Sequence, residues 1–143
     1  MSEDLLTWGE VVRILPEINK TTLNAWIWHG VIKPAIDVPR GAGRGRRRYY
    51  DVKNIISIYL AINLHKSFGT SGTQLRELID EANPEIDDYF IIPETLPAVA
   101  LLVNIKTAAK DLERRIGKSG LSTVKRTKLT KALNALASKG EGE

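Results

Sequence analysis

The residues that point most clearly to chemistry are arginines gathered in a short glycine-containing segment. Five of them fall between positions 40 and 48, with no acidic residue among them. A guanidinium group binds phosphate oxygens in pairs, and glycine lets the backbone approach a ligand closely. The cluster predicts an anionic partner, nucleic acid first, with a solvated loop or a protein-binding segment as alternatives. Its members are Arg40, Arg44, Arg46, Arg47 and Arg48, with Tyr49 beside them as a further candidate for contact with the sugar–phosphate backbone.

A second candidate group follows Asn19, a residue type that favours helix N-termini. Gly30 is placed to end the helix that starts there. Backbone N–H groups at such a terminus bind phosphate, and short polar side chains reach base edges. We expect this helix to contact DNA, against the alternative that its polar residues only cap the helix or face solvent. The candidates are Lys20, Thr21, Thr22 and Asn24.

Catalytic and metal-binding patterns are missing from the sequence. It contains no cysteine and only two histidines, His29 and His65. We find no nucleophile–base arrangement, phosphate-binding loop or paired carboxylates in a structured context. The sequence therefore predicts that the protein is not an enzyme and holds no metal or cofactor. The acidic start of the chain argues against a secretory signal, and the lack of a long apolar run argues against a membrane segment. The absence of cysteine favours the reducing cytoplasm, where a DNA-binding protein is expected to be nucleoid-associated.

Capping signals predict the elements that carry these residues. A helix is expected to begin at Thr7, with Glu10 at capping-box spacing, and to be followed by the helix after Asn19. Short extended segments are expected over 31–34 and 47–50, on either side of the arginine-rich loop. Together they would form a β-hairpin with a basic tip, which is the structure called a wing. Two further helices are expected after it. Asp51 is placed to cap the first and Ser71 the second.

The C-terminal part of the chain is expected to form a separate helical module. An acidic connector over 81–97 precedes a helix in which apolar residues recur at steps of four and three from Ala98 to Ile116. That spacing predicts a dimerisation helix or a helix face that packs on a last helix over 122–138. One helix can do both at once. Residues 139–143 are expected to form a disordered tail. The dimerisation candidates are Leu102, Ile105, Ala109, Leu112 and Ile116.

Over residues 5–80 the order of motifs resembles the DNA-binding domain of MerR-family transcription regulators. Five segments match in order: Thr-Trp-Gly-Glu-Val-Val at 7–12, Thr-Leu-Asn-Ala-Trp at 22–26, Gly-Val-Ile-Lys-Pro at 30–34, Arg-Tyr-Tyr at 48–50, and Gly-Thr-Ser with Leu-Arg-Glu-Leu over 69–78. Asn24 stands where the family usually has arginine, and the loop before Arg47 is longer and richer in arginine than a typical wing. Excisionases and the N-terminal domains of phage terminase small subunits resemble the segment nearly as well.

The resemblance implies a mainly α fold: a winged helix-turn-helix with a small β wing, followed by the helical C-terminal module. It also implies a sequence-selective protein that binds double-stranded DNA, most simply a homodimeric transcription regulator. Two alternatives stay open. One is a phage or plasmid protein that marks DNA for packaging, excision or partition. The other is a protein-interaction adaptor that keeps the fold without binding DNA.

Overall fold

The computed structural model describes residues 5–39, 45–68, 72–81, 89–91, 101–103 and 105–138. These residues are mainly helical, with two small antiparallel sheets of two strands each. The helices are α1 (Trp8–Ile14), α2 (Lys20–Trp28), α3 (Val52–Phe68), α4 (Gly72–Glu81), α5 (Ile105–Gly117) and α6 (Thr123–Ser138). The strands are β1 (Ile36–Pro39), β2 (Arg46–Tyr49), β3 (Tyr89–Ile91) and β4 (Leu101–Val103).

The first three helices begin where the capping signals place them. The Thr7 side chain accepts the N–H of Glu10, and the Glu10 carboxylate accepts the N–H of Thr7 at 3.0 Å, which completes the capping box of α1. Asn19 accepts the N–H of Thr22 at 2.8 Å and caps α2. Asp51 accepts the N–H of Asn54 at 2.9 Å at the start of α3. Ser71, the expected cap of α4, lies outside the described residues.

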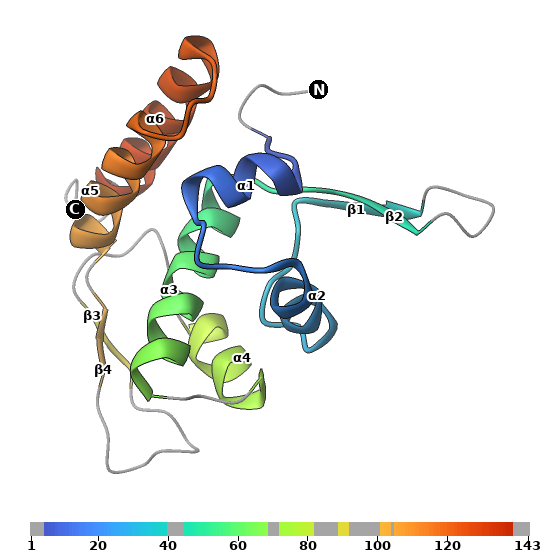
Figure 1. Cartoon of the computed structure of the whole chain (residues 1–143). Helices are drawn as coiled ribbons and strands as arrows, with labels where there is room; N and C mark the ends of the chain where they lie inside the picture. The colour runs from blue at the N-terminus through green and yellow to red at the C-terminus, as the bar shows by residue number, and fades with distance from the viewer. Residues whose placement is uncertain are drawn as a thin grey trace.

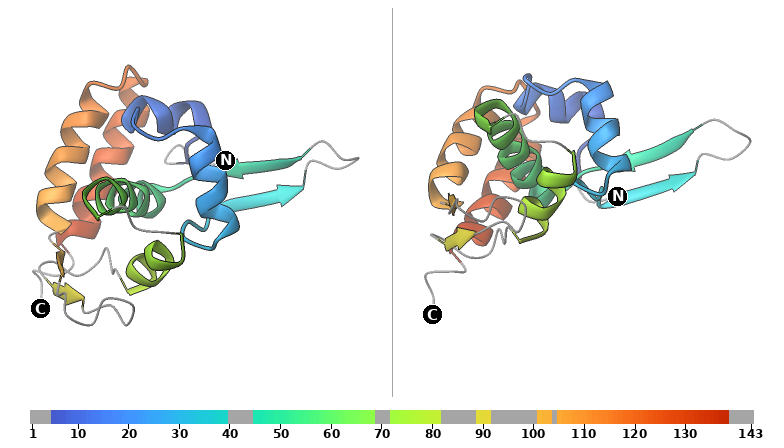
Figure 2. Two further views of the ribbon diagram at one scale, coloured as in Figure 1. Left: turned by 60° about the horizontal axis from the view of Figure 1, so that its bottom comes forward. Right: turned by 90° about the horizontal axis from the view of Figure 1, so that it is seen from below.

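The β1–β2 hairpin projects from one side of the molecule, and α5 and α6 lie side by side on the opposite side (Figures 1 and 2). Helix α3 runs between them. The base of the hairpin is joined to the entry of α1, because Leu6 and Tyr50 exchange two backbone hydrogen bonds of 2.7 and 2.9 Å. The orientation of the hairpin is therefore fixed relative to the first helix.

One apolar core joins the N-terminal helices to the C-terminal pair. Leu15 from the segment after α1, Ile58 from α3, Leu112 from α5 and Leu129 from α6 are among its fully buried members. Two ion pairs at the surface, Arg115 with Glu17 and Lys125 with Glu10, also join the N-terminal part of the chain to α5 and α6. Such continuous packing means that the helices after residue 104 support α1 and α3 directly.

The expectation of a strand over 31–34 is wrong, because the first strand of the hairpin is Ile36–Pro39. Val31 and Ile32 are buried in the core, and their N–H groups donate to Trp26 O at 2.8 and 3.3 Å. These residues therefore close the C-terminus of α2 and do not pair with β2. Gly30, with a φ of 76°, makes that closure possible, as its position in the sequence predicts.

The expected helix from residue 98 is also shorter than predicted, because α5 begins only at Ile105. Residues Leu101–Val103 form β4. This strand pairs with β3, which lies within the predicted acidic connector. A short run of apolar and β-branched residues fits a strand as well as a helix, and periodicity alone does not separate the two. The regular spacing from Ala98 to Ile116 is therefore not carried by one helix.

Candidate nucleic-acid interface

Helix α2 presents the polar residues expected to face DNA. Leu23 and Trp26 are buried and hold the helix against the core. Lys20, Thr21 and Asn24 are exposed, whereas the Thr22 N–H is already occupied by the Asn19 cap. The helix thus has one face that packs and one exposed face, which carries these polar residues.

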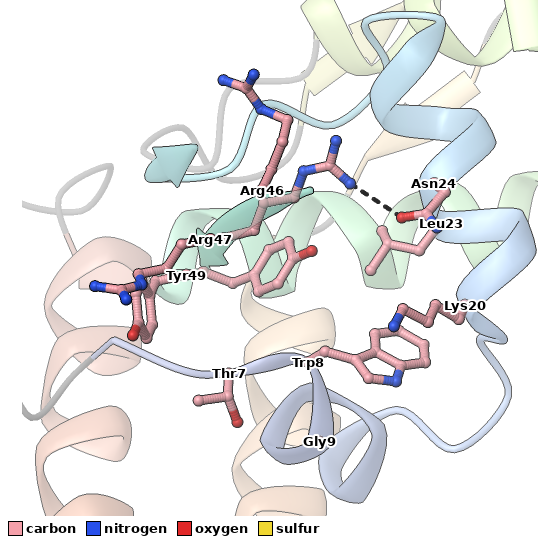
Figure 3. A pocket seen from close by; sticks show the side chains of 11 residues that line it. Thr7, Trp8, Gly9, Lys20, Leu23, Asn24, Arg46, Arg47 and Tyr49 are labelled. Carbon is pink, nitrogen blue, oxygen red and sulfur yellow. Dashed lines mark hydrogen bonds between the residues drawn. The ribbon is translucent and has the colours of Figure 1, made fainter. Parts of the chain in front are cut away.

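The hairpin divides its side chains between two faces. In its register Arg48 lies opposite Asp37, and Arg47 lies opposite Val38. Because side chains alternate along a strand, Arg46 and Arg48 share one face while Arg47 and Tyr49 share the other. Figure 3 shows Arg47 and Tyr49 extending away from Arg46. Two arginines of β2 therefore face the acid of β1, and one does not.

Asp37 organises the first of these faces. Its carboxylate accepts hydrogen bonds from Arg46 Nε and from Arg48 Nε, the latter at 3.3 Å, and Arg46 Nη2 also reaches the Asp37 carbonyl at 3.0 Å. The bond from Arg46 is the main reason that the pKa of Asp37 lies below its usual value, and Arg48 adds to it. Asp37 therefore offsets part of the hairpin's positive charge and holds two arginine side chains in place.

Arg48 also connects the hairpin to α2. Its Nη1 donates to Asn24 Oδ1 at 3.0 Å, the contact drawn in Figure 3. The side chain of Arg48 thus lies between an acid of β1 and an amide of the candidate recognition helix.

These elements enclose an open cleft of about 260 Å³ at the junction of α1, α2 and β2. Four basic residues line it: Lys20, Arg46, Arg47 and Arg48. The remaining lining residues carry no negative charge. They are Thr7, Trp8, Gly9, Leu23, Asn24, Tyr49 and Tyr50. Such a cleft attracts an anion that is large enough to touch both a helix and a strand.

The structure thus brings together eight of the ten residues predicted to contact DNA. Lys20, Thr21, Thr22 and Asn24 lie on α2, and Arg46, Arg47, Arg48 and Tyr49 form β2. The other two, Arg40 and Arg44, lie outside the described residues.

The residues predicted to form a dimer contact lie elsewhere. Ala109, Leu112 and Ile116 are buried in the core of the single chain. Leu102 belongs to β4 and Ile105 begins α5, and the side chains of both lie outside the described residues.

Two ion-paired groups link α1 and the turn after it to the C-terminal helices, and sequence reasoning did not find either of them. Arg115 of α5 binds both carboxylate oxygens of Glu17 at 2.7 Å, and Glu17 lies in the turn between α1 and α2. Lys125 of α6 binds both carboxylate oxygens of Glu10, the capping residue of α1, at 2.7 and 2.8 Å. The two residues of each pair are about a hundred positions apart in the sequence, so no local pattern predicts either pair.

The buried side chain of Asn54 is a further residue that the sequence did not single out. Its Oδ1 accepts the N–H groups of Ala35 and Asp51 at 2.9 and 3.1 Å, and its Nδ2 donates to Lys33 O at 2.8 Å. Asn54 therefore ties the segment leading into β1 to the start of α3. A polar residue on the apolar side of a predicted helix is the one sequence signal that points to it.

Within the part of the chain that the structure describes, no group of histidine and acidic residues is placed to hold a metal ion. Over the same residues, no helix is long and apolar enough to cross a membrane. Comparison of the chain with protein-family models, with curated proteins and with solved structures finds no match.

Proposed function

We propose that the chain binds double-stranded DNA through a winged helix-turn-helix of the kind that its sequence resembles, with α1 and α2 as the helix pair and β1–β2 as the wing. The observation that carries the proposal is the cleft between α2 and β2, which four basic residues and no acidic residue line. DNA phosphates are the natural ligands of such a surface. Each basic side chain that neutralises a phosphate releases a counterion condensed on the DNA, and this release favours binding.

Affinity comes chiefly from Lys20 and Arg47 in this proposal. Arg46 and Arg48 share the carboxylate of Asp37, so part of their charge is offset within the hairpin. Arg47 lies on the opposite face of the hairpin, away from Asp37, and Lys20 is exposed at the first turn of α2. These two side chains lie on different elements, so together they fix the position of the protein on the backbone.

Selectivity comes from the exposed face of α2 in the major groove. Asn24 lies on this face with its amide oxygen engaged by Arg48. Its amino group is then the part of the side chain left to donate to a base, and guanine and thymine offer acceptors in that groove. This differs from the paired contact that a free asparagine makes with adenine, which uses both the oxygen and the nitrogen of the amide.

The biological role that we propose is regulation of transcription by a homodimer that binds an inverted repeat. A contact between copies through Ala109, Leu112 and Ile116 would require the core to open, because all three are buried within one chain. In the proposal the dimer contact therefore lies on a surface other than these three side chains.

Selection of bound duplexes from a random library, read by sequencing, tests the proposal. We expect one enriched motif, and an inverted repeat within it if two copies bind together. Retention of duplexes without any enriched motif would contradict selectivity. A protein that retains no duplex at low salt would overturn the proposal as a whole and favour a protein-interaction role.

A further inference from the structure

Trp28, the last residue of α2, has a side chain that is 86% exposed. The other two tryptophans behave differently, since Trp26 is buried and Trp8 packs partly against the core. Two further large apolar side chains are exposed among the described residues, Val38 on β1 and Val124 on α6. A lone indole of this kind is too small to be the apolar patch that marks a protein–protein interface.

The position of Trp28 on the helix places it with the candidate DNA-contacting residues. Thr21, Asn24 and Trp28 are spaced by three and four residues, so they form one row along α2. All three are exposed, and Leu23 and Trp26 occupy the packed side. The row rises about 10 Å along the helix axis, which corresponds to about three base pairs of a duplex.

The charge around this row fits a duplex. The sequence has no acidic residue between Glu17 and Asp37, so the whole of α2 is free of negative charge. Lys20 begins the helix, and at its far end the Arg76 side chain lies close to Gly30, with Nε 3.5 Å from where a Cβ would stand. A basic side chain therefore lies near each end of the exposed row of α2, and the row itself carries the apolar ring of Trp28. This arrangement complements the major groove of DNA, whose edges are lined by anionic phosphates.

We propose that Trp28 inserts into the major groove and contacts the C5-methyl group of thymine. This inference rests on the proposed function and deepens it by naming a group that the helix reads. The methyl group of thymine is the apolar feature that base pairs present in this groove, so it is the group against which an indole can bury surface. The contact adds a preference for A·T pairs next to the C-terminal end of α2.

The contact is tested with Trp28→Ala and Trp28→Phe on the duplex selected from the random library. Trp28→Ala should weaken binding about tenfold while the slope of log K against log salt stays unchanged, because an indole neutralises no phosphate. Trp28→Phe should retain most of the affinity, since a smaller ring still reaches the methyl group. The matched control is Val124→Ala, which removes an exposed apolar side chain from α6 and should change nothing.

A second duplex with deoxyuridine in place of thymine isolates the methyl group. On it the wild-type protein should bind as weakly as Trp28→Ala, and the substitution should cause no further loss. Equal affinity of Trp28→Ala and wild type on the thymine duplex would overturn the inference and leave the proposed function intact. An equal loss on both duplexes, or a change in oligomeric mass without DNA, would also overturn it. Failure of the wild-type protein to bind any duplex would overturn the proposed function itself.

Discussion

Arg48 in β2 donates a hydrogen bond of 3.0 Å to the side chain of Asn24 in α2, which lies 24 residues earlier in the chain. The same guanidinium group bonds Asp37 at 3.3 Å. The candidate recognition helix and the hairpin are therefore not independent, because one side chain connects them. A surface that must match the groove and the backbone of DNA together gains from such a fixed geometry.

We expect the effects of Arg48→Ala and Asn24→Ala on DNA binding to be strongly non-additive. Each variant alone breaks the same contact, so the double variant should lose less than the sum, with a coupling of about 0.5–3 kcal/mol. Fluorescence anisotropy with labelled duplex gives the four affinities. Arg47→Ala with Asn24→Ala is the matched control cycle and should be additive, because the Arg47 side chain extends away from Asn24 (Figure 3). Additivity in both cycles would contradict the role given to Arg48.

Asn54 is expected to matter more for stability than any exposed asparagine. Its side chain is 8% exposed and serves three backbone groups. Asn54→Ala should lower the free energy of unfolding by roughly 2–4 kcal/mol, because it leaves buried donors and an acceptor unpaired. Urea denaturation measures the change. Asn63→Ala on the exposed side of α3 is the control, and an equal loss in the two variants would contradict this account.

Asp111 should contribute stability that disappears in acid. Hydrogen bonds from Tyr59 and then Arg114 lower the pKa of Asp111 to about 2. A carboxyl group whose pKa is depressed by folding stabilises the protein above its ordinary pKa, and this stability is lost as the pH falls from about 4 to about 2. Asp111→Asn should therefore cost about 2 kcal/mol at pH 6 and very little at pH 2. Urea denaturation across this pH range tests it, and a loss that does not depend on pH would contradict the assignment.

Leu112 is expected to act within one chain. Its side chain is fully buried in the core that α5 shares with the N-terminal helices. Leu112→Ala should lower the free energy of unfolding by about 2–5 kcal/mol, equally at protein concentrations tenfold apart. The neighbouring exposed Glu113→Ala is the control. A variant that keeps its stability as a monomer but loses a dimer would instead place Leu112 between chains.

The sequence was most informative where the structure depends on local bonds. Thr7, Asn19 and Asp51 cap helices as their spacing predicts, because a cap involves atoms only three residues apart. The hairpin and its basic character were also predictable, although β1 begins five residues later than expected, at Ile36. There the burial of Val31 and Ile32 in the core outweighs their preference for extended pairing.

Long-range contacts could not be read from the sequence. The partner of Arg115 is Glu17 and that of Arg48 is Asn24, and neither pairing leaves a mark in spacing or composition. The apolar spacing of α5 predicted a packed face but left its partner open, since a face of this kind suits a second copy as well as the same chain. Only the arrangement of the helices decides that Ala109, Leu112 and Ile116 pack within one chain.

The salt dependence of DNA binding by a charge-matched pair of double variants tests the central claim most directly. Lys20→Ala with Arg47→Ala removes two cations from the cleft, whereas Arg13→Ala with Lys110→Ala removes two exposed cations from α1 and α5, outside its lining. The slope of log K against log salt should fall by about 1.8 for the first pair, at about 0.9 for each lost phosphate contact. It should not change for the second. Equal slopes for the two pairs would contradict the proposal that this cleft binds DNA.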